Sequence, residues 1–358
     1  MEYITDAMEM VDHVVQPAFC VREGTIVKVN PAAAARMIEP GRKISEILKT
    51  GSEEYAAFTD GCLYLTLSLC AGNCGAAVIR KKDFDLFLLE QEAEQDGLQA
   101  MALAARELRE PLSSIMISAE RIFPSIDPED SKMRDHAARI NRGLFQMLRM
   151  ISNMADANRY ATQAESRQEM VDLSAFLGEI VSKASALAEH TGIRLNARLH
   201  PEPVWSLADS EKLERAAYNI ISNALKFAPE NSTVDISLVR RGNKLCFSVS
   251  DKGPGIPEQV RSTLFSRYVR EPALEDGRYG IGLGLVLIRS AAALHGGTVL
   301  VDHPEGTGTR VTITLAICPG TADTLASPKM RVDYAGEWDH GLLELSNSLP
   351  AALYNPQK

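Results

Sequence analysis

The sequence predicts an α+β protein made of three consecutive parts: a small α/β module, a helical hairpin and a larger α/β sandwich. The chain begins with short β-type runs. A long region with apolar residues at every third or fourth position follows, and helices then alternate with strands in the second half. With 358 residues the chain is long enough for two or three domains, and its 45% hydrophobic content suffices for packed cores.

Composition excludes several classes of partner. A net charge of −9 and a pI near 5.4 argue against nucleic acid or an anionic membrane surface. The six cysteines show no paired metal-ligand spacing, which indicates free thiols in a reducing compartment. Residues 61–79 are uncharged, but they alternate with period two and Gly72-Asn73 interrupts them, so two strands are expected rather than a membrane span. Because no signal peptide opens the chain, we expect a cytoplasmic protein.

Residues 1–83 are expected to form the α/β module. Two β-type runs surround Glu23-Gly24, Pro31 opens a short Ala-rich helix, and a hairpin at 61–80 closes the module. The stretch 24–32 resembles the opening of a PAS sensory domain. That resemblance implies a sensor, but the sequence contains no evident cofactor anchor, so a ligand sensor and an empty structural module both stay open.

Residues 84–160 are expected to form a helical hairpin that turns between Pro124 and Pro128. Its apolar face is too wide for two helices to cover, so a homodimer through residues 98–154, closing a four-helix bundle, is expected. The alternative is a hairpin packed against a neighbouring domain of its own chain. The apolar positions are Leu98, Met101, Ala105, Leu108, Leu112, Ile115, Ala119 and Ile122, followed by Met133, Ala137, Ile140, Leu144, Met147, Ile151 and Met154.

Residues 171–318 contain a series of short motifs. Asn219 and Asn223 lie one turn apart on a predicted helix, and glycine-rich segments follow at intervals. In this order and spacing the motifs resemble the conserved boxes of the Bergerat, or GHKL, ATP-binding fold that histidine kinases share with DNA gyrase. The later motifs are Asp251-Lys252-Gly253-Pro254-Gly255, the run Leu264–Tyr268, and Gly280-Ile281-Gly282-Leu283-Gly284.

The resemblance implies ATP and Mg²⁺ as cofactors and a role for each matched residue. Asn223 matches the Mg²⁺ ligand with Asn219 as its support, and Asp251 matches the carboxylate that accepts from the adenine amino group. The other matched residues are Gly253 and Gly255 beside the ring, Gly280, Gly282 and Gly284 at the phosphates, and the cations Lys226 and Arg270. The structural alternative is that the asparagines close a helix onto a loop and the two cations are solvated.

The position four residues before the metal asparagine separates the families of this fold. The ATPases that use water have a glutamate general base there. This chain has Asn219, an amide that cannot accept a proton near neutral pH. Hydrolysis of ATP by water is therefore disfavoured, and the upstream hairpin also favours the histidine kinases.

Residues 104–112 resemble the phosphoacceptor box of sensor histidine kinases, His-Glu-Leu-Arg-Thr-Pro-Leu. Arg106 occupies the histidine position, and a guanidinium stays protonated and offers no lone pair to phosphorus. Glu107 keeps the place of the activating carboxylate but has nothing to activate. Glu110 stands where Thr or Asn orients water, and its charge would repel a phosphorylated aspartate. His136 cannot substitute, because it lies ~18 Å along the hairpin from the level of Arg106.

Three functions stay open. The chain is a nucleotide-gated regulatory scaffold descended from a histidine kinase, an active kinase that phosphorylates a partner's histidine in trans, or a binding module with a vestigial pocket. The resemblance implies a response-regulator receiver domain or a partner kinase as binding partner. Residues 319–358 receive no assignment from the sequence.

Overall fold

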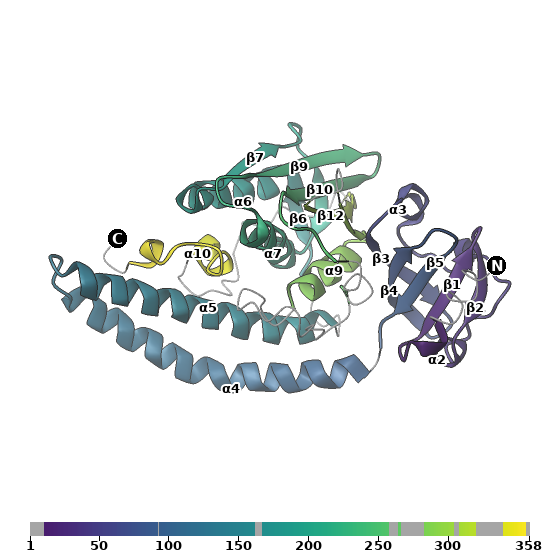
Figure 1. The fold of residues 1–358 in the computed structure, drawn as a ribbon, viewed down its shortest axis with the longest axis horizontal. Helices are drawn as coiled ribbons and strands as arrows, with labels where there is room; N and C mark the ends of the chain where they lie inside the picture. Colours follow the sequence, from purple (N-terminus) through teal and green to yellow (C-terminus); the bar gives the residue numbers. More distant parts are fainter. Residues whose placement is uncertain are drawn as a thin grey trace.

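The computed structural model describes residues 11–91, 93–161, 167–257, 264–265, 283–303, 308–319 and 339–355. A small β-rich module lies at one end of the molecule, and a larger α/β domain lies above a long helical hairpin (Figure 1). The predicted α+β class is confirmed.

The N-terminal module is an antiparallel sheet in the order β2-β1-β5-β4-β3. Glu23 and Gly24 both have positive φ and form the turn between its first two strands. Asn30 caps α2 by accepting from the Ala33 N–H at 2.9 Å, and Pro31 follows at the first helical position. The elements are β1 (Ala18–Arg22), β2 (Thr25–Val29), α2 (Pro31–Ala34), η1 (Ile44–Glu46), α3 (Ser52–Ala57), β3 (Cys62–Leu69), β4 (Gly72–Arg80) and β5 (Asp85–Leu89); β3 and β4 are the hairpin expected at 61–80.

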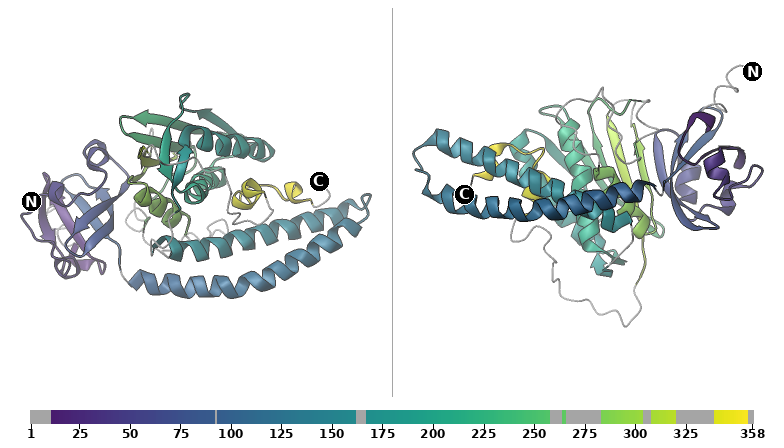
Figure 2. Two further views of the ribbon diagram at one scale, coloured as in Figure 1. Left: turned by 180° about the vertical axis from the view of Figure 1, so that it is seen from behind. Right: turned by 90° about the horizontal axis from the view of Figure 1, so that it is seen from below.

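Two long antiparallel helices form the hairpin. They are α4 (Ala93–Ile122) and α5 (Ser131–Ala161), with the short η2 (Phe123–Ser125) at the turn. α5 lies between α4 and the C-terminal domain, as seen in Figure 1 and from behind in the left view of Figure 2. The hairpin therefore packs on its own chain through α5, while α4 keeps exposed apolar residues such as Ile115 and Ile122. Within the described residues, the apolar content of each helix falls short of what crossing a bilayer requires.

The C-terminal domain places α6, α7 and α9 against a sheet in the order β11-β12-β10-β9-β7. The pairs β9 with β10 and β11 with β12 are antiparallel ladders. Its elements are β6 (Glu169–Asp172), α6 (Leu173–Ala188), η3 (Glu189–Thr191), β7 (Arg194–Arg198), β8 (Trp205–Ala208), α7 (Ser210–Phe227), β9 (Thr233–Arg241), β10 (Lys244–Asp251), α9 (Gly284–Leu294), β11 (Val299–Asp302) and β12 (Thr309–Ala316).

One strand contact joins the two sheets. β3 of the N-terminal module pairs with β11, so that Tyr64 faces Val299 and the combined sheet has 10 strands. Gly61 precedes this contact with φ of 95°, and a Cβ there would lie 2.1 Å from the Val301 carbonyl oxygen. The Glu90 carboxylate adds polar contacts: it accepts from the Tyr64 hydroxyl at 3.0 Å and pairs with Arg289 at 3.0 Å.

The C-terminal segment lies between the hairpin and the C-terminal domain (Figure 1). It contains α10 (His340–Glu344), capped by Asp339 through the Leu342 N–H at 2.9 Å, and η6 (Ala351–Tyr354). Leu343, Leu345 and Leu349 are fully buried within the main core. The segment is therefore part of the packed fold.

Candidate nucleotide-binding site

Helix α7 positions the two asparagines. The Asp209 carboxylate caps the helix by accepting from the Lys212 N–H at 3.1 Å. Asn219 is buried, and Asn223 is half-buried one turn further on. Both face the first residue of α9, because a Cβ on Gly284 would lie 3.2 Å from the Asn219 Oδ1 and 4.0 Å from the Asn223 Nδ2. The structure thus brings three of the sequence-predicted residues together.

Asp251 ends β10 as a buried carboxylate. Its Oδ1 accepts from the Gly253 N–H at 2.7 Å, and the Thr309 N–H also donates to it. Burial raises the pKa of Asp251 above its usual value, while these two backbone donors and nearby His303 oppose that rise. The carboxylate keeps capacity for a further donor, as recognition of an amino group requires.

Close backbone approach explains the glycines around Asp251. A Cβ on Gly253 would lie 2.6 Å from the Phe227 carbonyl oxygen, at the end of α7. Gly255 has φ of 77°, in the left-handed region. Gly308, which the sequence analysis did not single out, also has φ of 77°, and a Cβ there would lie 2.1 Å from the Asp251 carbonyl oxygen. The sequence Glu-Gly-Thr-Gly at 305–308, typical of a turn, was the available signal for it.

The remaining predicted residues divide into two groups. Lys226 is half-buried in the last turn of α7 with its Nζ 4.9 Å from the centre of the Phe227 ring. A cation is favourable at a helix C-terminus even without a bound phosphate, so the position of Lys226 does not by itself indicate a nucleotide contact. Gly280, Gly282 and Arg270 lie outside the described residues.

Arg106 and Glu107 do not join this cluster. Both side chains are exposed on α4, the outer helix of the hairpin. The nucleotide-site candidates lie on α7, β10 and α9, beyond α5 (Figure 1). With the C-terminal domain packed on α5, Arg106, at the position expected for the phosphoacceptor, is therefore separated from the candidate nucleotide site.

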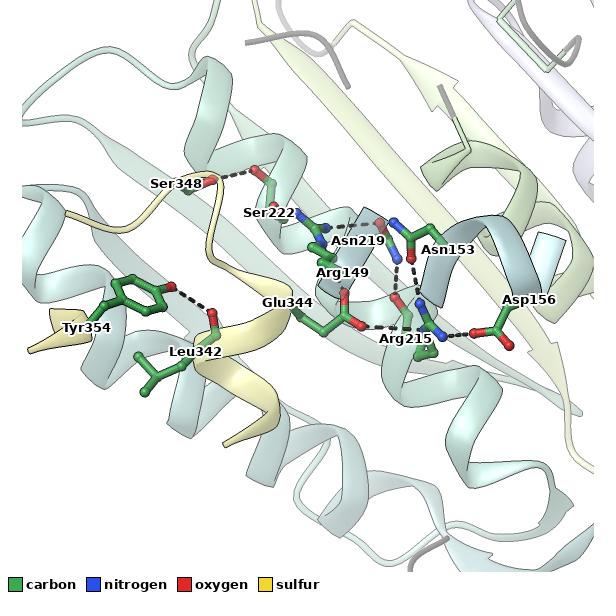
Figure 3. A network of polar contacts seen from close by, with 10 residues as sticks. All are labelled: Arg149, Asn153, Asp156, Arg215, Asn219, Ser222, Leu342, Glu344, Ser348 and Tyr354. Atoms are coloured by element: carbon green, nitrogen blue, oxygen red, sulfur yellow. Dashed lines mark hydrogen bonds and ion pairs between the residues drawn. The ribbon is translucent and has the colours of Figure 1, made fainter. Parts of the chain in front are cut away.

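Arg149 of α5 is a polar residue near the site that sequence reasoning missed. Its Nη2 donates to the Asn219 Oδ1 at 3.1 Å and its Nη1 donates to the Ser222 Oγ at 3.2 Å (Figure 3). The Asn219 amide nitrogen in turn donates to the Arg215 carbonyl at 2.8 Å. No local sequence pattern could predict this contact, because Arg149 and Asn219 are 70 positions apart.

A family model agrees with this geometry. Residues 208–318 match the family described as "Histidine kinase-, DNA gyrase B-, and HSP90-like ATPase", a range that contains every candidate nucleotide residue. The C-terminal domain is thus a member of the GHKL class of ATPase domains.

Among the proteins with this kind of ATPase domain, the relatives of this chain are histidine kinases. The chain is 30% identical over 263 residues to the hybrid signal transduction histidine kinase D of Dictyostelium discoideum, covering 70% of this chain and 17% of the relative. It is 29% identical over 246 residues to the adaptive-response sensory kinase SasA of Crocosphaera subtropica, covering 65% of this chain and 64% of SasA. The chain is therefore a homologue of the sensor histidine kinases, and it spans less than two thirds of the length of these two relatives.

A solved structure supports the fold. Full-length ShkA in complex with AMPPNP superposes with a TM-score of 0.51 at 24% identity, covering 63% of this chain and 47% of ShkA. The similarity extends beyond the length of the ATPase domain alone.

Proposed function

We propose that this chain is a nucleotide-gated regulatory scaffold that binds Mg-ATP and does not phosphorylate itself. The observation that supports it is a contrast between two places in one molecule. Asn219, Asn223 and Gly284 meet at one point and Asp251 stands beside its glycines, whereas Arg106 occupies the expected acceptor position.

The residues present fit Mg-ATP. The Asn223 amide oxygen is a hard ligand of the kind Mg²⁺ prefers, and the metal would neutralise charge on the phosphates. The Asp251 carboxylate would accept from the adenine amino group, with Gly253 giving the ring room to approach. Gly284 begins α9, whose free N–H groups and dipole suit phosphate oxygens.

The chemistry of the hairpin supports a regulatory scaffold that does not phosphorylate itself. Arg106 cannot act as a nucleophile, and Glu107 beside it is then vestigial. An active kinase that transfers phosphate in trans to a partner's histidine is the second candidate, because the same pocket would serve it. Partners of either form would be a receiver domain of a response regulator or a partner kinase.

A second copy of the chain is the partner proposed for the hairpin. Exposed apolar residues recur every seven positions on both helices, a spacing typical of helix bundles. We propose that residues 98–154 form a homodimer in the cytoplasm, with the N-terminal module as a PAS-like input domain. The boundary expected at residues 83 and 84 moves, because β5 (Asp85–Leu89) pairs with β1 and β4 of that module and the dimerisation hairpin begins at Ala93. Residues 171–318 are then the ATPase domain.

The test measures binding and transfer separately. Purified protein is titrated with Mg-ATP by calorimetry, and then incubated with γ-labelled ATP alone and with candidate receiver or phosphotransfer proteins. Saturable binding without acid-labile label supports the scaffold, while label on a partner's histidine supports the second candidate. Label on the chain itself, or absence of binding, contradicts the proposal.

Arg106→His is the matched variant for the acceptor. If only the missing imidazole prevents self-labelling, this variant should gain acid-labile label. A variant that binds Mg-ATP but gains no label would mean that the hairpin has changed in more than its acceptor.

A further inference from the structure

The C-terminal segment, residues 339–355, is held on α5 by side chains that donate hydrogen bonds to its backbone carbonyl groups. The Asn141 amide donates to the Tyr354 carbonyl at 2.8 Å, and the Gln146 amide donates to the Ser346 carbonyl at 3.1 Å. The Tyr354 ring stands edge-on to Phe145 with ring centres 5.2 Å apart. Polar and aromatic contacts thus fix the segment along the face of α5 that is turned toward the C-terminal domain (Figure 1).

Glu344 is the centre of a buried ionic network. Its carboxylate is 0% exposed and lies 3.1 Å from the Arg149 Nε of α5 and 3.4 Å from the Arg215 Nε of α7 (Figure 3). Arg215 also pairs with Asp156 of α5. Two guanidinium groups and two carboxylates from three elements therefore balance within the interior, and removing one charge leaves another uncompensated.

The same network reaches the candidate nucleotide site. Arg149, held by Glu344, also donates to the Asn219 Oδ1 and the Ser222 Oγ. The segment contacts α7 directly, because the Ser348 hydroxyl donates to the Ser222 carbonyl at 3.2 Å. One guanidinium group thus links the C-terminal segment to the helix that carries Asn219 and Asn223.

The start of α9 is held by the hairpin as well. Leu283 and Leu287 pack in a separate buried cluster with Leu98 of α4 and Ala157 of α5. Leu283 directly precedes Gly284, which faces the two asparagines. Both elements expected to enclose the phosphates are consequently in contact with the hairpin, α7 through Arg149 and α9 through this cluster.

We propose that residues 339–355 are an intramolecular clamp that holds the ATPase domain on α5 and thereby weakens its binding of Mg-ATP. The inference rests on the proposed nucleotide site. Arg149 already occupies the Asn219 Oδ1, and Leu283 beside Gly284 is packed against Leu98 and Ala157. On this proposal a triphosphate is enclosed only when Asn219 and the start of α9 adjust, and the clamp restricts that adjustment. The apparent dissociation constant is the intrinsic constant divided by the fraction of molecules that are competent, so releasing the clamp tightens binding.

Glu344→Gln is the variant that tests the clamp, because it keeps the shape of the side chain and removes its charge. Glu202→Gln, an exposed carboxylate in the same chain, is the matched control. Hydrogen exchange should increase in 141–149 and 215–222 for Glu344→Gln alone, and its Mg-ATP dissociation constant should fall by about fivefold or more. Tyr354→Ala loosens the far end of the segment and should act in the same direction if Glu344→Gln does not fold.

The two readouts separate this inference from the proposed function. Unchanged exchange in both clamp variants overturns the clamp, whatever the affinity for nucleotide. Increased exchange with unchanged or weaker Mg-ATP binding overturns its regulatory effect. Failure of every protein, wild type included, to bind Mg-ATP contradicts the proposed function and with it the nucleotide effect, while the exchange comparison still decides whether the clamp exists.

Discussion

Asn223 carries the most specific chemistry of any single residue in the candidate site. Asn223→Asp keeps the side-chain shape but adds a negative charge where the triphosphate is expected. We expect Mg-ATP to bind about tenfold more weakly, equivalent to ~1.4 kcal/mol, because like charges at close range repel. Calorimetry measures the change, with Asn243→Asp in the exposed β9–β10 turn as control. Equal affinity of the two variants would argue against the site.

His295 gives the ATPase domain a defined pH dependence. Its Nε2 accepts from the Asp209 N–H at 3.0 Å, so the ring is neutral with Nδ1 donating to the Ala291 carbonyl at 2.7 Å. Burial lowers the pKa of His295 below 6.5, and nearby Lys212 adds to that, while Asp209 and the Ala291 carbonyl oppose it. The unfolded chain therefore takes up a proton at a higher pH than the folded domain does.

This difference in proton uptake determines whether the free energy of unfolding rises or falls with pH. Stability from neutral His295 is present above the unfolded pKa and is lost as pH falls below about 6.5, by up to ~1.4 kcal/mol per pH unit. Urea denaturation at pH 7.5 and 5.5 should show a smaller loss of unfolding free energy in His295→Gln than in wild type. His190→Gln, at an exposed histidine of the same domain, is the control for the loss of an imidazole. Asp251, whose pKa is raised, titrates in the opposite sense but is common to all three proteins.

Single residues also mark the limit of sequence reasoning. The proposed site residues Asn223 and Asp251 could be singled out because the motifs that they match have one residue type at a fixed spacing from glycines. Glu344 and Arg149 are not, because they are separated by 195 positions and each is an ordinary charged residue in its local context. When the partner of a charged residue comes from a distant element, the local sequence pattern does not predict the ion pair.

Among the elements, local pairing was predictable and the contact between modules was not. The β3–β4, β9–β10 and β11–β12 pairs are hairpins whose turns and alternation are visible in the sequence. The β3–β11 contact joins strands of two different parts of the chain, and edge pairing through backbone groups requires no particular side chain. The sequence therefore indicated two separate sheets where the structure has one.

Gly61 tests whether this strand contact matters. Gly61→Ala places a methyl group 2.1 Å from the Val301 carbonyl oxygen, so β3 and β11 must move apart. We expect faster hydrogen exchange in 62–64 and 299–302. Gly72→Ala is the control, because Gly72 also has positive φ, of 123°, but has nothing within 4 Å of the added atom. Equal exchange in the two variants would mean that the modules are held by other contacts.

The whole hairpin presents two apolar ridges that remain about half exposed in the part of the chain that the structure describes. Leu108, Ile115 and Ile122 repeat every seven residues on α4, and Met133, Ile140 and Met147 do so on α5; each is between 48% and 60% exposed. Counting outward from a turn near Asp127-Pro128, we expect each residue of one ridge to lie level with one of the other. Matched levels on neighbouring helices form a continuous seam, the surface that a second hairpin covers in a four-helix bundle.

Ile115→Lys places a charge in the middle of this seam. Burying an unpaired ammonium group is costly, so the dimer should dissociate about tenfold or more readily than wild type. Sedimentation velocity over a concentration series measures the equilibrium, with Met37→Lys, 56% exposed on the N-terminal module, as control. Because α5 already packs on the ATPase domain, the folded monomer should persist after dissociation. A wild-type chain that stays monomeric would contradict the homodimer. A dimer indifferent to Ile115→Lys would mean that its interface lies elsewhere.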